Sequence, residues 1–250
     1  MKRILITGGP TNEYIDEVMK ITNMSTGSLS VSLGEYFLDA GYRVVLVLNN
    51  SVNIKAIESR ENLKVVRIET TDDMLNKLQE ESTLEDFDCI IHASAVGDYK
   101  SEFSFLMEDM AKEIYENLDG IKSEEDILKI LTNPNCKIND DSKISSYQKN
   151  LTTKLTLTPK IIARLREWFP NTLLIGCKLL ENVAKQELYD VAQKLSVKNN
   201  MDFIFANDLA DLRKGQSARY VVDKDGFTGS VLDKPKDIFE FVDEKIKSDK

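Results

Sequence analysis

Short apolar runs rich in β-branched residues alternate along this chain with segments in which apolar residues recur every three or four positions. Arg43–Leu48 (RVVLVL) is the clearest run, and its unbroken apolar character is typical of a strand buried on both faces of a sheet. Strands that alternate with helices favour a doubly wound, mostly parallel sheet with right-handed crossovers. The predicted fold class is therefore α/β, with a Rossmann-like sheet.

The predicted elements can be given in chain order. The strands are Arg3–Ile6, Arg43–Leu48, Leu63–Ile68, Asp88–His92, Leu173–Cys177 and Phe203–Ala206. The helices between them are Gly27–Ala40, Thr71–Gln79 and Val183–Lys198. Towards the end of the chain, an Asp-Gly pair predicts a hairpin turn. The last elements are Ala218–Val222 and Gly226–Val231, the two arms of this hairpin, and a helix over Lys236–Lys247.

One long segment, about 100–154, interrupts this alternation. It contains two acidic helical patterns, Met107–Leu118 and Ser123–Leu131, followed by a polar, loop-like stretch over Asn135–Lys149. An insertion of this length is usually functional or an interaction element. Because there is no internal repeat and no low-complexity linker, we expect residues 1–250 to form a single domain that carries this insertion.

Composition and charge narrow the classes of function. The net charge of −9 excludes nucleic-acid binding as a main role, because there is no basic face to replace counterions. No stretch approaches eighteen apolar residues, so no membrane span is predicted. The first apolar segment is too short for a signal peptide, and three widely spaced cysteines without a CxxC pair are typical of reduced thiols. These features predict a cytoplasmic protein.

Three segments would meet at the carboxyl edge of the predicted sheet, where open α/β folds bind ligands. The first is the unusually long loop between Ile4 and Gly27, whose uncovered amides and hydroxyls before a helix form an anion site. The second follows the fourth strand, and the third follows the strand that ends at Ala206. The candidate residues in them are Gly8, Gly9, Ser25, Thr26, Gly27, Ser94, Ala95, Asp98, Asn207 and Asp208.

Each candidate also has an ordinary structural explanation. Gly8-Gly9 is compatible with a simple tight turn, Ser25 or Thr26 with a helix cap, and Asp98 with a turn cap. His92 is the only histidine, and its place in an apolar strand predicts a core residue rather than a base. Lys143, in a polar loop, is typical of a solvated charge. These signals alone do not define a reaction.

Taken together, the segments resemble the phosphopantothenate–cysteine ligase family of coenzyme A biosynthesis. The likeness extends over nearly the whole chain, and the order and spacing of six blocks make it specific. It is closest to the free-standing bacterial form, without a fused flavin decarboxylase domain. The blocks are Gly8–Asp16, Ile21–Gly27, Ala95–Tyr99, Lys143–Ser146, Thr158–Ile162 and Ile175–Leu179, followed by Lys194, Lys198 and Ala206–Asp208.

The resemblance implies a ligase that joins 4'-phosphopantothenate and L-cysteine. The pantothenoyl carboxylate would first be attached to the α-phosphate of a nucleoside triphosphate, with release of pyrophosphate, and the cysteine amine would then form the amide. The resemblance implies CTP rather than ATP as co-substrate, and Mg²⁺ with the nucleotide, although no protein ligand of the metal can be assigned. It also implies a homodimer, paired through the insertion.

The resemblance assigns roles to individual residues. Asn23 would hydrogen-bond the carboxylate or the acyl intermediate, and Lys143, on a flap, would neutralise charge at the α-phosphate. Ser94 and Ala95 would contact the substrate together with Asn23. The residues implied to bind the nucleotide are Gly8, Gly9, Ser25, Thr26, Gly27, Asp98, Pro159, Lys160, Ile161, Ile162, Cys177, Lys194 and Lys198.

The chain departs from the family pattern at three positions. Met19 stands where an arginine is common, Cys177 where an aromatic residue lies beside the base, and Ser30 where a glycine follows the Ser-Thr-Gly block. One alternative is therefore a non-catalytic or weakly active nucleotide-binding relative. A second alternative, an NAD(P)-dependent oxidoreductase, lacks a second glycine at the required spacing, and its second strand ends on Asn49 rather than on an acid.

Overall fold

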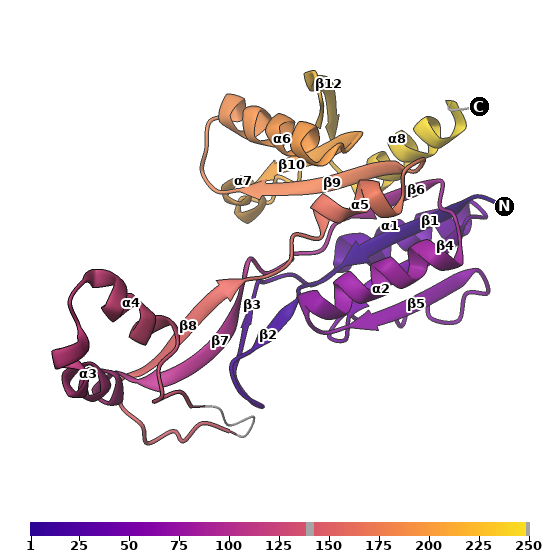
Figure 1. Ribbon diagram of the computed structural model, residues 1–250. Coiled ribbons are helices and arrows are strands. Elements are labelled where there is room, and N and C mark those ends of the chain that lie inside the picture. Colours follow the sequence, from indigo (N-terminus) through magenta and orange to yellow (C-terminus); the bar gives the residue numbers. More distant parts are fainter. Residues whose placement is uncertain (139–142, 249–250) are drawn as a thin grey trace. The chain divides into compact units, whose positions relative to one another are not determined.

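The computed structural model describes residues 1–138 and 143–248, and the chain divides into two compact units (Figure 1). Unit 1 consists of Met1–Thr11, Asn23–Val96 and Pro159–Lys250, and unit 2 consists of Asn12–Thr22 and Gly97–Thr158. The insertion predicted at about 100–154 lies within unit 2, which also includes part of the opening loop. The interpretation of residues 1–250 as one ligase domain stays a prediction.

Unit 1 is built on an eight-stranded sheet with the order β12-β11-β10-β9-β6-β1-β4-β5. Six neighbouring strands of this sheet are parallel, namely β10, β9, β6, β1, β4 and β5. β11 and β12 add an antiparallel hairpin next to β10. The predicted fold class and the C-terminal hairpin are confirmed. The strands are β1 (Arg3–Gly8), β4 (Arg43–Asn49), β5 (Leu63–Ile68), β6 (Cys89–His92), β9 (Leu173–Leu180), β10 (Phe203–Asp208), β11 (Arg219–Asp223) and β12 (Gly226–Leu232).

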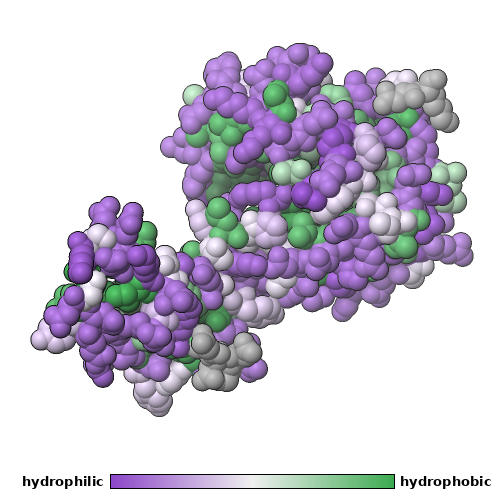
Figure 2. All heavy atoms as spheres, viewed as in Figure 1, coloured by the Kyte–Doolittle hydropathy of each residue, from purple (hydrophilic) through white to green (hydrophobic). Residues whose placement is uncertain are grey.

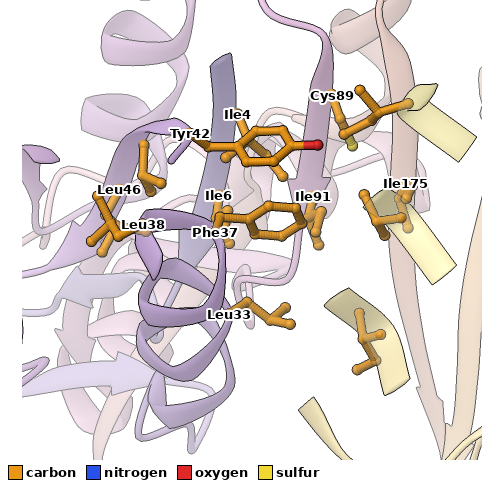
Figure 3. Close-up of a cluster of buried hydrophobic side chains, with 14 of the residues drawn as sticks. Ile4, Ile6, Leu33, Phe37, Leu38, Tyr42, Leu46, Cys89, Ile91 and Ile175 are labelled. Atoms are coloured by element: carbon orange, nitrogen blue, oxygen red, sulfur yellow. The ribbon is translucent and has the colours of Figure 1, made fainter. Parts of the chain in front are cut away.

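Helices cover both faces of this sheet. On one face, α1 (Ser28–Asp39) and α8 (Pro235–Ser248) bury one apolar cluster, in which Phe37 of α1 faces Ile6 of β1 and Ile91 of β6 (Figure 3). On the other face, α2, α5 and α6 bury a second cluster. The bounds of the remaining helices of unit 1 are α2 (Thr71–Leu84), α5 (Ile162–Trp168), α6 (Lys185–Asn199) and the short α7 (Leu209–Arg213).

Local sequence explains where these helices begin. Thr70 and Asp73 form a capping box at the start of α2, since the Thr70 hydroxyl accepts from the Asp73 N–H and the Asp73 carboxylate accepts from the Thr70 N–H. The helix then continues to Leu84, beyond the predicted end at Gln79. α6 ends at Asn199 because Asn200 adopts a left-handed conformation, with φ of 50°.

Unit 2 contains two antiparallel strand pairs that the sequence analysis missed. β2 (Asn12–Tyr14) pairs with β3 (Lys20–Thr22), and the longer β7 (Tyr99–Leu106) pairs with β8 (Leu151–Leu157). The predicted helices are confirmed as α3 (Met107–Glu116) and α4 (Glu124–Thr132), with a 3-10 turn at Leu118–Gly120 between them. Within the predicted loop Asn135–Lys149, positions 139–142 lie outside the described residues.

A small apolar core and an apolar surface characterise unit 2. Phe103, Phe105 and Met110 form the core of this unit. Apolar side chains of α3, α4 and the turn between them remain exposed, and Figure 2 shows hydrophobic residues on the surface of this unit. They are Met107, Tyr115, Leu118, Ile127, Leu128 and Leu131. In the described part of the chain, no helix has the length and apolar character that a bilayer span requires.

Candidate active site

Gly9 and Gly27 lie side by side at the carboxyl end of β1, although seventeen residues separate them in the sequence. Both have positive φ, 80° and 69°, a backbone conformation that favours glycine. A Cβ at Gly27 would lie 3.1 Å from the Gly9 nitrogen and 2.7 Å from Val52 Cγ2, so neither glycine has room for a side chain. The long opening loop therefore brings two unobstructed stretches of backbone together at the N-terminus of α1.

The first turn of α1 lies directly against β1. Ser30 is buried, and its hydroxyl donates a 2.8 Å hydrogen bond to the Thr7 carbonyl. A Cβ at Gly8 would overlap the Ser30 side chain and lie 2.9 Å from Leu48 Cδ2. Gly8 thus permits the close approach of the helix, and Ser30 fastens the helix to the strand.

The hydroxyls of Ser25 and Thr26 lie in the turn before α1 rather than capping it. The N-cap is Gly27, and no side chain caps the helix. Ser25 Oγ accepts from the Gly27 N–H at 3.3 Å, and Thr26 Oγ1 accepts from the Ser28 N–H at 3.4 Å. The predicted side-chain cap is wrong, because the left-handed conformation of Gly27 turns the chain into the helix instead. A helix N-terminus without a side-chain cap is suited to an anionic ligand.

The end of β6 is fixed to β1 by a buried polar contact. His92 Nδ1 lies 2.9 Å from Thr7 Oγ1, which also accepts from the Ser94 N–H at 3.2 Å. Burial lowers the pKa of His92 to about 4, so the imidazole is neutral at pH 7. His92 is a core residue, as predicted. The Ser94 hydroxyl is buried, and among the described residues it has no hydrogen-bond partner.

Asn23 is held at the same edge of unit 1. Its side-chain amide donates a 2.9 Å hydrogen bond to the Val96 carbonyl. Beyond the sheet, Ala95 continues the pairing of β6 with β1, because its N–H donates to the Gly9 carbonyl at 2.9 Å and its carbonyl accepts from Thr11. The structure therefore brings Asn23, Ala95 and the glycines Gly9 and Gly27 together at the carboxyl edge.

Thr158–Ile162 leads into α5. Ile161 is buried in the apolar cluster under α2 and α6, and a Cβ at Gly176 would lie 3.1 Å from Ile162 Cδ1. The isoleucine side chains are therefore part of the core, whereas Lys160 is exposed and Pro159 half-buried at the start of the segment. The implied contacts of Pro159, Lys160, Ile161 and Ile162 with a nucleotide stay a prediction.

Cys177 lies on β9 with its side chain on the face covered by α1 and α8. Burial raises the pKa of its thiol to about 11, so the thiol is neutral at pH 7. A neutral, half-buried thiol is a packing group and a poor nucleophile. Its predicted place beside the nucleotide base stays a prediction.

Lys194 and Lys198 do not lie at the carboxyl edge. α6 runs back along the sheet from the end of β9. Its last turn lies near the amino ends of the strands, because the Met201 N–H donates to the Ser196 carbonyl and the Asp202 N–H donates to the Leu174 carbonyl near the start of β9. Both lysines are exposed on the second half of this helix. The structure does not bring them together with Gly9 and Asn23, and their role in nucleotide binding stays a prediction.

Asp98 and Lys143 belong to unit 2. Asp98 is exposed at the start of β7, and its backbone carbonyl accepts from the Thr158 N–H at 3.1 Å. Lys143 is also exposed, and it is the first described residue after the gap at 139–142.

A buried carboxylate in unit 2 anchors the segment that carries Lys143. Asp16 accepts hydrogen bonds from the N–H groups of Val18 at 2.8 Å, Met19 at 2.6 Å and Ile144 at 2.9 Å. The Met19 bond, the Ile144 bond and the charge of Lys143 all lower the pKa of the Asp16 carboxyl. The ionised carboxylate therefore joins the loop after β2 to the segment at 143–146.

Sequence reasoning did not identify the roles of Asp16, Thr7 and Ser30. Asp16 was noted only as part of a motif. In an Asx turn the aspartate carboxylate accepts from the backbone N–H groups two and three residues later, which here are those of Val18 and Met19. The bond of Asp16 to Ile144 links positions 128 residues apart, and no local signal predicts it. The contact of Ser30 with Thr7 likewise depends on how α1 packs on β1.

The described residues contain no group of three or more His, Cys, Asp or Glu side chains placed to hold a metal ion. Mg²⁺ is commonly bound through one or two carboxylates together with substrate phosphates and water. The side chains present are compatible with an ion that arrives with the nucleotide, and Asp98 is an exposed carboxylate of the predicted site.

Comparison with known proteins identifies the family of this chain. The family described as the DNA/pantothenate metabolism flavoprotein C-terminal domain matches residues 1–138. The coenzyme A biosynthesis bifunctional protein CoaBC of Methanocaldococcus jannaschii is 29% identical over 252 residues, which cover 98% of this chain and 50% of that protein. The CoaBC protein of Thermococcus kodakarensis is 27% identical over 224 residues, covering 90% of this chain and 45% of that protein.

A solved structure extends the likeness over the whole chain. The DNA/pantothenate metabolism flavoprotein of Streptococcus pneumoniae is 33% identical, with a TM-score of 0.81 and complete coverage of both chains. The chain spans about half the length of the curated relatives that it matches. It belongs to the DNA/pantothenate metabolism flavoprotein C-terminal domain family.

Proposed function

We propose that this chain is a phosphopantothenate–cysteine ligase that uses a nucleoside triphosphate, with CTP favoured over ATP. The observation that carries the proposal is the convergence, in a member of this family, of Gly9, Gly27 and Asn23 at the carboxyl edge of a parallel sheet. An edge with two positive-φ glycines and an uncapped helix N-terminus fits a phosphorylated substrate. The relatives named above act in coenzyme A biosynthesis according to their names.

The chemistry follows from the inertness of a carboxylate towards an amine. In the first step a carboxylate oxygen of phosphopantothenate attacks the α-phosphorus, and pyrophosphate leaves. In the second step the cysteine nitrogen attacks the acyl carbon, loses a proton, and expels the nucleoside monophosphate. The protein would supply phosphate sites, hydrogen-bond donors and exclusion of water.

In this proposal each group of residues has a separate role in binding the substrates. Gly8, Gly9, Ser25, Thr26 and Gly27 hold phosphate through backbone and hydroxyl groups. Asn23, fixed on Val96, presents its amide to the carboxylate or the acyl intermediate, and Ser94 and Ala95 line the substrate. The buried hydroxyl of Ser94 supports this assignment, because a buried hydroxyl without a protein partner among the described residues is satisfied by a ligand or water.

The remaining roles extend the proposal to charge and assembly. Lys143 neutralises charge at the α-phosphate, Asp98 contacts the nucleotide, and Mg²⁺ accompanies the triphosphate and offsets its charge. We also propose a cytoplasmic homodimer. The three cysteines are free thiols, as is usual in the cytoplasm, and the exposed apolar side chains of α3 and α4 provide a surface for pairing.

Product formation tests the function. The protein is incubated with phosphopantothenate, cysteine and either CTP or ATP in the presence of Mg²⁺, and the amide and pyrophosphate are measured. Pyrophosphate without cysteine, and amide only with cysteine, is the expected result. Nucleotide binding without either product would favour the non-catalytic alternative, for which Met19, Cys177 and Ser30 are the specific departures. Binding of NADH without pyrophosphate release would favour an oxidoreductase.

A further inference from the structure

Arg219 is a half-buried arginine that pairs with no carboxylate among the described residues. The chain has eight arginines, and most of them pair with a carboxylate. These six are Arg3, Arg43, Arg60, Arg164, Arg166 and Arg213. Arg67 instead donates to the carbonyls of Asn49 and Val52. Within residues 1–138 and 143–248, Arg219 has no ion pair, and its guanidinium donates one hydrogen bond, of 2.9 Å, to the Ser217 carbonyl.

The position of Arg219 places it at the carboxyl edge of the unit-1 sheet. It is the first residue of β11, which is antiparallel to β10 and pairs Tyr220 with Ala206. The next residues beyond this pair are Arg219 and Asn207, so both lie where β10 ends. On the other side, Arg219 pairs with Leu232 of β12, shortly before α8 begins at Pro235.

The side chain of Arg219 projects from the same face as Cys177. Along β11, Tyr220 and Val222 belong to the cluster under α6, whereas Val221 and the paired Leu232 belong to the cluster under α1 and α8. Alternation along the strand therefore directs Arg219 to the face of α1, whose N-terminus carries Gly27. This is also the face on which Cys177 packs.

No described carboxylate compensates the charge of Arg219. The side chain is half-buried, and burial lowers the pKa of its guanidinium, with Cys177 as the neighbouring titratable group. The Cys177 thiol, with its pKa raised to about 11, is neutral at pH 7 and supplies no counter-charge. A partly desolvated guanidinium with one bonded N–H and unused donors is suited to a ligand with several anionic oxygens.

We propose that Arg219 binds a phosphate group of an anionic substrate at the carboxyl edge of the unit-1 sheet. The identity of the substrate rests on the proposed function, which supplies two sources of phosphate, the nucleoside triphosphate and phosphopantothenate. The guanidinium fork matches phosphate geometry. The site thus contains a cationic donor that does not belong to the motifs shared with the ligase family.

The test is a direct binding measurement on the intact protein. Arg219→Gln, Arg219→Lys and the unchanged protein are titrated separately with CTP plus Mg²⁺ and with phosphopantothenate, by calorimetry. The affinity of Arg219→Gln for one of the two ligands should fall by about 10- to 100-fold, because a charge-assisted hydrogen bond is lost. The ligand affected identifies the source of the phosphate. Arg219→Lys keeps the charge without the fork, so its affinity for that ligand should lie between those of Arg219→Gln and the unchanged protein.

A matched control and a stability measurement separate binding from structure. Arg60→Gln removes a guanidinium that pairs with Asp39 and should change neither affinity by more than about twofold. The melting temperature of Arg219→Gln should be unchanged or higher, since a half-buried cation without a carboxylate partner is removed. Affinities within twofold of the unchanged protein for both ligands, or failure of Arg219→Gln to fold, would overturn the proposal.

The product assay keeps this inference separate from the proposed function. If the unchanged protein forms no amide but Arg219→Gln still loses affinity for the triphosphate, the ligase assignment fails and the phosphate contact stands. If the unchanged protein forms the amide and Arg219→Gln binds both ligands normally, the phosphate contact fails and the ligase assignment stands.

Discussion

The carboxylate of Asp16 accepts a 2.9 Å hydrogen bond from the backbone N–H of Ile144, the residue after Lys143. The same carboxylate accepts from Val18 and Met19, so it links the loop after β2 to the segment of the proposed charge-neutralising lysine. In the proposed mechanism Asp16 is therefore a positioning residue for Lys143.

Replacement of Asp16 should lower turnover through Lys143. In Asp16→Ala the segment at 143–146 loses its anchor, and kcat should fall while the unit-1 sheet stays folded. Asp16→Asn keeps one acceptor oxygen and should retain more activity. The measurement is kcat and KM for amide formation with both variants. Glu17→Gln, which changes the exposed neighbouring carboxylate, serves as the control. An unaltered kcat in Asp16→Ala would contradict this role.

Removal of the Lys143 charge should reduce catalysis without unfolding the protein. Lys143 is exposed, so Lys143→Ala should leave the melting temperature unchanged. Its turnover should fall by about 10²- to 10³-fold if the lysine stabilises charge at the α-phosphate. Lys149→Ala, an exposed lysine in the same loop, is the matched control and should remain fully active. Equal turnover in the two variants would remove Lys143 from the mechanism.

The contact between Gly8 and Ser30 should appear in stability measurements. Gly8→Ala places a Cβ against Ser30 and Leu48 Cδ2, and overpacking of this kind should lower the free energy of unfolding by about 1–3 kcal/mol. Ser30→Ala removes the bond to Thr7 and should lower it by about 1 kcal/mol. Because the two sites touch, the double variant Gly8→Ala/Ser30→Gly should lose less stability than the sum of the losses in Gly8→Ala alone and Ser30→Gly alone. Additive values from urea unfolding would argue against the contact.

The buried imidazole of His92 should make stability depend on pH. Its pKa is lowered from 6.5 to about 4 by burial, so the unfolded chain binds a proton that the folded chain does not. Stability from this group is complete above about pH 6.5 and decreases as the pH falls towards 4, by about 3 kcal/mol in total. Urea unfolding of the unchanged protein and of His92→Gln at pH 7 and pH 4.5 measures the difference. The drop between these pH values should be smaller in His92→Gln.

The sheet of unit 1 was predictable because its signals are local. The unbroken apolar run Arg43–Leu48 and the Asp-Gly pair before Phe227 each define an element without reference to the rest of the chain. The strand pair β7–β8 was missed because polar and apolar residues mix in Tyr99–Leu106 and Leu151–Leu157, and their pairing spans the whole insertion. The three-residue strands β2 and β3 are too short for any periodicity to show.

The candidate site was predictable in part for a related reason. Gly9 and Gly27 follow from the rule that ligands bind at the carboxyl ends of parallel strands, and Asn23 follows from the family resemblance. The structure brings the three together. Arg219 carries no motif, and only the register of β11 on β10 places it at this edge. Lys194 and Lys198 were proposed from resemblance, but the direction of α6 places them at the other end of the sheet.

The chain passes between its two units at Thr11–Asn12, Thr22–Asn23, Val96–Gly97 and Thr158–Pro159. Three of these junctions adjoin residues of the candidate site, Asn23, Asp98 and Pro159, and none interrupts a strand of the eight-stranded sheet. A shortened chain that joins residue 11 to residue 23 and residue 96 to residue 159 would therefore retain that sheet in full. The second unit is thus an insertion at two points of the chain, and every strand of the eight-stranded sheet comes from the first unit.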